Sequence, residues 1–239
     1  HSIYGFVRFA DEIVDSFHGF DKKQLLEDFT NDTYKAIDQK ISLNPILNSF
    51  QNVVNKYNID LKLIEQFLYS MEMDLEKVEY DSVKYEQYIL GSAEVVGLMC
   101  LKIFVYGDQQ EYLKLKPYAM KLGSAFQKIN FLRDLKDDFT DLDRTYFPNM
   151  GDGKLSLQDK VNIENEIKKE FDEALVGIKL LPKSSRFGVY VSYKYYTKLL
   201  NKIKRKTTKD LLTERIRIAN QTKLFVFANS FIRNSINVL

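Results

Sequence analysis

Apolar residues recur every three to four positions along almost the whole chain, which is the spacing that places them on one face of an α-helix. Only 10 Gly and 4 Pro occur among the 239 residues, so the chain has few of the residues that favour turns or a long linker. We therefore expect an all-α protein in which residues 1–239 form a single helical domain. The predicted helices cover residues 2–17, 21–41, 46–57, 61–73, 81–106, 119–148, 157–181, 184–206 and 209–237.

A polar stripe runs along the predicted helix 119–148. The residues around this stripe are mostly apolar, and a helix that is apolar nearly all round is a buried helix. Burying carboxylates without partners is costly, so such groups are paired or hold a metal ion. The stripe therefore predicts one wall of a polar site inside a helical bundle. The residues of the stripe fall within roughly 80° of one another around the helix axis. They are Gly123, Gln127, Asn130, Asp134 and Asp138.

A second stripe with the same design lies near the start of the chain. Tyr4, Arg8, Asp11 and Asp15 span about 60° of a helix and are also set among apolar residues. Either Asp-x-x-x-Asp pair alone fits a solvated acidic face equally well. Two such pairs, each on an apolar helix and each beside an arginine, favour a functional site.

The residue types in the two stripes suit a diphosphate held by Mg²⁺. Carboxylates placed close together repel one another, and cations relieve that repulsion. Mg²⁺ prefers carboxylate oxygens and is usually completed by water and by substrate phosphates. Arg8 and Arg133 lie beside the acidic pairs, and a guanidinium suits bidentate contact with phosphate.

Composition and charge narrow the remaining classes of function. The 35 Lys and Arg nearly balance the 33 Asp and Glu, which gives a formal net charge of +2 and argues against a nucleic-acid partner. A single cysteine, Cys100, excludes an intrachain disulfide. We find no run of 18 apolar residues and no signal-peptide pattern, and we expect a cytoplasmic protein. The chain begins at His1 inside a predicted helix, so we expect that an N-terminal helix is missing from this sequence.

Three segments of the chain resemble the squalene and phytoene synthase family, the head-to-head prenyl synthases. They are Tyr-Gly-Phe-Val-Arg-Phe-Ala-Asp-Glu-Ile-Val-Asp at 4–15, the small-residue run at 88–97, and Leu-Gly-Ser-Ala-Phe-Gln-Lys-Ile-Asn-Phe-Leu-Arg-Asp-Leu-Lys-Asp-Asp at 122–138 with Tyr-Phe-Pro at 146–148. The resemblance extends over essentially the whole chain. It implies an isoprenoid-synthase-type helical bundle with a central apolar tunnel, and with Mg²⁺, or alternatively Mn²⁺, at the tunnel mouth.

The resemblance also implies roles for individual residues. The metal ions would be held by Asp11, Asp15, Asp134 and Asp138. Catalytic roles would belong to Tyr4, Arg8, Tyr88, Arg133 and Tyr146. The prenyl diphosphate substrate would be bound by Gln127, Asn130, Tyr196 and Arg215.

The form of the first motif looks closest to bacterial phytoene synthases. We therefore expect condensation of two geranylgeranyl diphosphates to phytoene through a cyclopropylcarbinyl diphosphate, with no nicotinamide cofactor. A squalene or dehydrosqualene synthase that uses farnesyl diphosphate is the alternative within the class. A non-catalytic scaffold relative is the alternative from another class. Its aspartate motifs would be degraded, whereas all four aspartates are intact here.

Two further features bear on partners and packing. A basic cluster would contact an anionic membrane surface at the inner face of the membrane, or else form a solvated helix end. Glu94 stands where the family usually has a small residue, so we expect a charge pair or different packing there. We expect the protein to be a monomer. The basic cluster consists of Lys198, Lys202, Lys204, Arg205, Lys206 and Lys209.

Overall fold

The computed structural model of the protein describes residues 1–75, 80–140, 146–148 and 155–235, and every regular element within these ranges is a helix. The expected all-α fold is therefore confirmed. In chain order the helices are α1 (Ser2–Asp15), α2 (Lys22–Gln39), α3 (Pro45–Tyr57), α4 (Leu61–Met73), α5 (Ser82–Ile89), the π-helical turn η1 (Leu90–Glu94), α6 (Val95–Phe104), α7 (Gln109–Thr140), α8 (Leu157–Leu180), α9 (Lys183–Ile203), α10 (Thr208–Thr213) and α11 (Asn220–Ser235).

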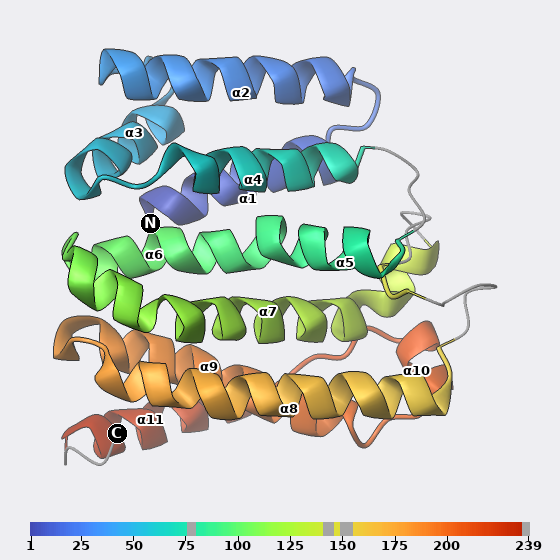
Figure 1. The fold of residues 1–239 in the computed structure, drawn as a ribbon. Helices are drawn as coiled ribbons and strands as arrows, with labels where there is room; N and C mark the ends of the chain where they lie inside the picture. Colours follow the sequence, from blue (N-terminus) through green and yellow to red (C-terminus); the bar gives the residue numbers. More distant parts are fainter. Residues whose placement is uncertain (76–79, 141–145, 149–154, 236–239) are drawn as a thin grey trace.

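The long helices run back and forth along one common direction (Figure 1). α2, α3, α1 and α4 form one side of the bundle, and α8, α9 and α11 form the other. The stretch α5–η1–α6 and the long helix α7 lie between these two sides, and α7 makes its most extensive contacts with α8, α6 and η1. α7 is thus the central helix that the polar stripe predicted.

Short polar residues start the helices where the sequence indicates. The carboxylate of Asp21 accepts a hydrogen bond from Gln24 N at 3.0 Å at the start of α2. The side chain of Asn44 accepts one from Ile46 N at 3.0 Å, and Pro45 occupies the first turn of α3. Such caps satisfy backbone donors that have no partner inside the helix.

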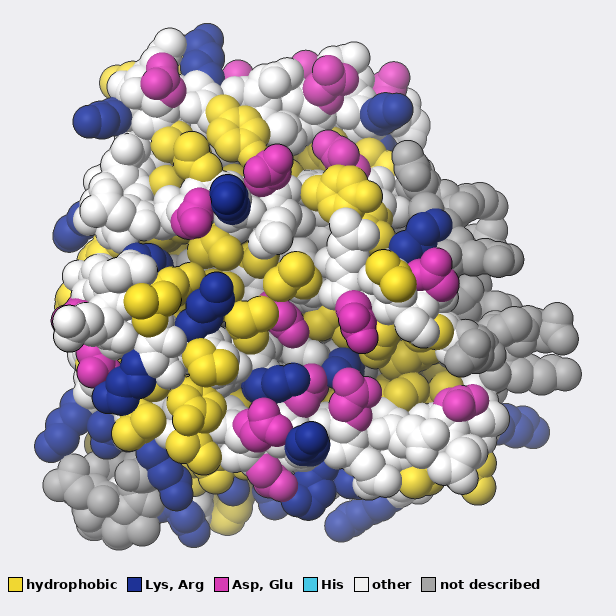
Figure 2. Space-filling model, viewed as in Figure 1, with side chains coloured by type: hydrophobic (Ala, Val, Ile, Leu, Met, Phe, Trp, Pro, Cys, Tyr) yellow, Lys and Arg dark blue, Asp and Glu magenta, His cyan; other side chains and the backbone are white. Residues whose placement is uncertain are grey.

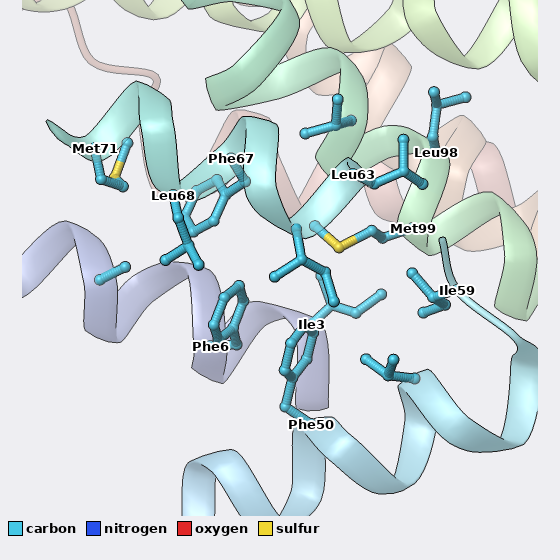
Figure 3. Close-up of a cluster of buried hydrophobic side chains, with 14 of the residues drawn as sticks. Ile3, Phe6, Phe50, Ile59, Leu63, Phe67, Leu68, Met71, Leu98 and Met99 are labelled. Carbon is cyan, nitrogen blue, oxygen red and sulfur yellow. The ribbon is translucent and has the colours of Figure 1, made fainter. Parts of the chain in front are cut away.

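Two hydrophobic clusters hold the bundle together. The first joins α1–α4 and α6, and Figure 3 shows its centre, where Phe6, Phe50 and Phe67 meet. The rings of Phe6 and Phe50 stack with centroids 3.9 Å apart, and both side chains are fully buried. The second cluster joins α5, α7, α8 and α9. Because α1 belongs to the first cluster and most of α7 to the second, the two predicted polar stripes lie in different halves of the core.

Small residues let the central helices approach closely. A Cβ atom added to Gly91 would lie 2.5 Å from the carbonyl oxygen of Gln66 in α4. One added to Gly123 of α7 would lie 2.7 Å from the carbonyl oxygen of Ala93 in η1. Both distances are shorter than real Cβ contacts, so only glycine fits at these crossings.

The continuous helical stretch Ser82–Phe104 is long and apolar enough, by length and composition, to cross a membrane, which the sequence analysis did not expect. The core helix of a helical bundle meets the same criterion. In this structure the stretch packs against α4 and α7.

The predicted helix 209–237 is wrong, because the chain leaves the helix between α10 and α11. Glu214 is extended, and the following segment runs back along α7, where Ile216 N donates to Arg133 O at 3.3 Å. Burial of Ile216 and Ile218 favours this path over a continuous helix. The central helix begins earlier than residue 119, at Gln109, and is described as far as Thr140. The predicted continuation at 141–145 and the loop at 149–153 lie outside the described residues.

Candidate active site

A cavity of about 390 Å³ lies between η1, α6, α7, α8 and α9. Its walls are mostly apolar, and the part contributed by α7 extends from Leu115 to Asn130. Gln127, Asn130 and Tyr196, three of the four predicted substrate-binding residues, lie on its wall. The cavity fits the apolar tunnel that the resemblance implies.

Hydrogen bonds connect the polar residues of the cavity. Tyr196 donates its hydroxyl to Asn130 Oδ1 at 3.1 Å, and Asn130 Nδ2 donates to Gln127 Oε1 at 3.3 Å. The Tyr196 ring stacks on Phe126 with centroids 4.0 Å apart. Burial raises the pKa of Tyr196, so its hydroxyl stays protonated and continues to donate. The amides are therefore held in fixed orientations on an apolar wall.

The stripe on α7 continues from Asn130 to a cluster of charges. Asp134 pairs with Arg133 from its own helix, and Arg215 Nε lies 2.7 Å from Asp134 Oδ1. Arg215 also contacts Asp137 at 3.6 Å. The Arg133 pKa is raised: burial lowers it, but the hydrogen bond and the charge of Asp134 outweigh that effect. Two guanidinium groups and two carboxylates thus meet one helical turn beyond the cavity wall.

The first stripe places its charges on one side of α1. Arg8 pairs with both Asp11 and Glu12. Burial and, next, the nearby charge of Asp15 raise the pKa of Asp11, although Arg8 opposes this. Tyr4 lies on the same helix and is 71% exposed. The pair Asp11 and Asp15 therefore carries mutual repulsion that a cation would relieve.

The two acidic pairs lie at the same end of the bundle, because α1 and α7 both have their C-terminal ends there (Figure 1). Among the described residues, no three acidic, histidine or cysteine side chains are close enough together to hold one ion by themselves. The donor set still fits Mg²⁺, which keeps several waters and takes phosphate oxygens together with one or two carboxylates. Asp11, Asp15, Asp134 and Asp138 are the residues that would hold it.

Tyr88 and Tyr146 do not line the cavity but lie beside it in an aromatic cluster. Their ring centroids are 4.9 Å apart, and Tyr146 stacks on Phe131 at 4.3 Å. Both hydroxyls donate to Asp74, which directly follows α4.

Sequence reasoning assigned no chemistry to three carboxylates that the structure places among the predicted site residues. Asp137 and Glu12 each neighbour a motif aspartate in the chain, so their position was a usable signal. Asp74 belongs to a short segment with no polar stripe, and only the fold brings it to the two tyrosines.

Glu94 is half-buried and lies near a cluster of charges between α7 and α8. Burial and the nearby charge of Glu170 raise its pKa, while Lys121 and Lys128 lower it. Lys128 Nζ lies 2.8 Å from Glu170 Oε1. The charge of Glu94 is thus influenced by carboxylates and lysines of α7 and α8.

The fold and the site together define a class of helical protein with an apolar cavity next to paired carboxylates and arginines. Residues 1–151 match the sequence profile of the family described as Squalene/phytoene synthase. The chain belongs to the squalene/phytoene synthase family, as the three motifs indicated.

Two relatives named phytoene synthase are similar to this chain. A chloroplastic phytoene synthase from an Oncidium hybrid cultivar is 28% identical over 98% of this chain and 62% of its own length. A phytoene synthase from Pseudescherichia vulneris is 27% identical over 61% of this chain and 49% of its own length. The chain thus spans about three fifths or less of the length of these relatives.

Solved structures share the fold. A dehydrosqualene synthase in complex with a ligand superposes with a TM-score of 0.79 at 17% identity, covering 97% of this chain and 84% of that one. The squalene synthase HpnC from Alicyclobacillus acidocaldarius gives a TM-score of 0.72 at 19% identity, covering 85% and 81%. At these identities the likeness supports the architecture alone.

Proposed function

We propose that the protein is a prenyltransferase that condenses two geranylgeranyl diphosphates head to head to phytoene, through a cyclopropylcarbinyl diphosphate and with release of diphosphate. The observation that carries the proposal is the continuity of α7. One face of this helix gives the apolar cavity its wall and its amides, and the next turn presents Arg133 and Asp134. A substrate with a long apolar chain and a diphosphate head needs both surfaces side by side.

Each part of the site has a defined task in this reaction. Arg133 and Arg215 bind the diphosphate and offset the charge that develops on it as it leaves. Asp11, Asp15, Asp134 and Asp138 would hold Mg²⁺, which would further neutralise that charge. The apolar cavity wall keeps water away from the allylic cation, and aromatic faces such as that of Phe126 stabilise positive charge. The hydrogen-bonded amides of Gln127 and Asn130 orient the head of the substrate.

The α7 face of the cavity is long enough to accommodate the longer substrate. Leu115 and Asn130 are fifteen residues apart on α7, which corresponds to about 22 Å along a helix. An extended chain covers about 1.2 Å per bond, so a geranylgeranyl chain of four isoprene units needs about 18 Å and a farnesyl chain of three units about 13 Å. The cavity wall is therefore long enough for the C20 chain.

Product analysis by mass spectrometry tests the proposal. The purified protein is incubated with Mg²⁺ and either geranylgeranyl or farnesyl diphosphate, each with and without NADPH. We expect phytoene and released diphosphate from geranylgeranyl diphosphate without NADPH, and slower turnover of farnesyl diphosphate. The Asp134→Asn variant serves as the inactive control.

Other outcomes would redirect the assignment. Turnover of farnesyl diphosphate alone, or only after NADPH is added, would identify a dehydrosqualene or squalene synthase instead. No turnover of any prenyl diphosphate by a folded protein would contradict the proposal and favour a scaffold role.

We also propose that the protein is a monomer that docks on the inner, cytoplasmic face of an anionic membrane. The basic cluster lies at the end of α9, and exposed apolar side chains follow on α11, among them Leu224 and Phe225 at 70% and 63% exposure. Lys and Arg side chains predominate along the lower edge of Figure 2, the side on which α8, α9 and α11 lie. Basic side chains attract anionic headgroups, and exposed aromatic side chains suit the interface.

A further inference from the structure

Asp74 connects three segments that are distant in the chain. It directly follows α4, and its two oxygens accept hydrogen bonds from two different phenols. Tyr88 OH donates to Oδ2 at 2.7 Å, and Tyr146 OH donates to Oδ1 at 3.0 Å. Both donors are residues to which the family resemblance gives catalytic roles.

The two phenols are buried and tightly packed. Tyr88 is 4% exposed and Tyr146 is 6% exposed. Tyr146 stacks on Phe131, which directly follows the cavity residue Asn130 on α7. One helical turn after Tyr88, Ser92 of the cavity wall donates its hydroxyl to the main-chain oxygen of Tyr88 at 2.7 Å. The tyrosine pair is thus adjacent, along the helices and through Phe131, to residues of the cavity wall.

The electrostatic surroundings keep the Tyr88 hydrogen in place. Burial, and next the charge of Asp74, raise the pKa of Tyr88 well above its ordinary value. Tyr88 therefore remains a phenol at all working pH values and continues to donate to the carboxylate. A phenol that donates to an anion has a more electron-rich ring, and such a ring attracts a cation more strongly.

We propose that Asp74 is a positioning residue for the reaction: it fixes the orientation of Tyr88 and Tyr146 and increases the electron density of their rings. The inference rests on the proposed function, since it needs a carbocation next to the tyrosines. The carboxylate itself stays behind the phenols, where it stabilises positive charge without being alkylated. No bond is formed or broken at Asp74.

If the role of Asp74 is purely structural, it connects α4, α5 and the segment of Tyr146 and has no effect on the reaction. The two roles predict different results for substitutions that remove one hydrogen bond at a time. Asp74→Asn keeps the size of the side chain but removes its charge. Tyr88→Phe and Tyr146→Phe keep the ring and the carboxylate but remove one donor each.

The experiment compares these variants with the wild type and with Tyr106→Phe. Tyr106 donates to Ser184 Oγ at 3.0 Å on an exposed surface, so its substitution is a matched loss of one phenol hydrogen bond. Four quantities are measured: Tm, binding of inorganic pyrophosphate with Mg²⁺, kcat with geranylgeranyl diphosphate, and the ratio of cyclopropylcarbinyl diphosphate to final product.

For Asp74→Asn we expect a kcat at least tenfold lower, more released intermediate, and pyrophosphate binding within twofold of wild type. Adding Asp74→Asn to the Tyr88→Phe/Tyr146→Phe double variant should lower kcat little further, because Asp74 acts through these hydroxyls. Tyr106→Phe should match the wild type. If Asp74→Asn does not fold, the two Phe variants carry the test, each with a lower kcat at an unchanged pyrophosphate affinity.

Unchanged kcat and product ratio in the folded variants, with only Tm lowered, would overturn the inference while the proposed function stands. A wild-type protein that turns over no prenyl diphosphate would overturn the proposed function and the inference with it.

Discussion

Asp134 is held by two arginines from different parts of the chain, Arg133 and Arg215. A carboxylate with two cationic partners is well compensated before any metal ion arrives. When ions and a diphosphate bind, the same guanidinium groups are placed to contact the phosphate oxygens. The arginines therefore neutralise Asp134 in the empty site and contact the diphosphate when it is bound.

Arg133→Lys should weaken diphosphate binding while keeping the charge, because lysine lacks the planar fork of the guanidinium. A hydrogen bond to a charged group contributes about 1.5–3 kcal/mol, so we expect affinity for pyrophosphate with Mg²⁺ to fall roughly tenfold to a hundredfold. Calorimetric titration measures the change. Arg205→Lys, at an exposed position, is the matched control. Wild-type affinity in Arg133→Lys would mean that Arg133 has a structural role only.

Asp11→Asn should not lower stability when metal is absent. The pKa of Asp11 is raised in the folded protein, first by burial and then by Asp15. Folding therefore favours its protonated form, and that contribution is complete below the unfolded pKa of about 3.9 and is lost as the pH rises through the folded pKa. At neutral pH the ionised carboxylate therefore destabilises the folded protein, and replacement by asparagine removes that destabilisation.

Thermal unfolding in EDTA between pH 4 and pH 7 measures this effect. We expect the Tm of Asp11→Asn to equal or exceed that of the wild type at pH 7, and the difference to shrink toward pH 4. Pyrophosphate with Mg²⁺ should raise the Tm of the wild type more than that of the variant. A lower Tm for the variant in EDTA at pH 7 would contradict the assignment of Asp11 to a repelling pair.

At the scale of single residues, the sequence identified those site residues that recur at helical spacing on one helix. The amides and carboxylates of α7 share one face, so the pattern alone placed Gln127 and Asn130 on a common wall. It could not pair Arg215 with Asp134, or Asp74 with the two tyrosines, because these contacts are tertiary. The aromatic cluster around Tyr88 and Tyr146 was not predictable for the same reason.

At the scale of elements, α7 and α8 are joined by both charge and close approach. Lys128 is 3% exposed and lies 2.8 Å from Glu170 and 2.5 Å from Glu166. A Cβ atom on Gly177 would lie only 2.2 Å from Cβ of Tyr118. The contact leaves no room for a side chain on α8 at this crossing.

Gly177→Ala should therefore destabilise the protein. Overpacking a tight contact costs about 1–3 kcal/mol, which corresponds to a drop in Tm of roughly 2–12 °C for a chain of this size. Gly188→Ala is the matched control, since Gly188 is exposed in α9 and a Cβ there meets nothing within 4 Å. The free energy of unfolding of the control should rise by about 0.5–1 kcal/mol, because alanine has a higher helix propensity than glycine. Equal Tm values for the two variants would contradict the close approach.

Helix starts were predictable where a capping residue marks them, as at Asp21 and Asn44. The end of the chain was not, because residues 209–237 have helical composition throughout. The break between α10 and α11 arises from burial of Ile216 and from the bond between Arg215 and Asp134. These are tertiary contacts, and they override local propensity.

At the scale of the whole molecule, the basic cluster and the exposed side chains of α11 make one side of the bundle suited to an anionic surface. Replacing Lys198, Arg205 and Lys209 together by Glu should weaken binding to phosphatidylglycerol vesicles. Each basic residue near such a surface contributes about 1 kcal/mol, and Glu adds repulsion, so the affinity should fall by at least roughly a hundredfold.

Vesicle co-sedimentation measures the change, with phosphatidylcholine vesicles as the neutral reference. Lys23, Lys35 and Lys62, exposed on α2 and α4 at the opposite side of the bundle, provide the matched triple Glu control. Equal losses in the two triple variants would show that only net charge matters, and would contradict a defined docking side.

The π-helical turn η1 has a consequence for how chains of this architecture vary in length. A π turn holds one residue more than an α turn, whereas one residue inserted into a regular α-helix rotates everything beyond it by about 100°. Here the wide turn lies between Tyr88 and Gly97, and both residues make close tertiary contacts. Deletion of a single residue between these positions would convert the π turn into an α turn, so it should leave the cavity walls on either side facing the same way.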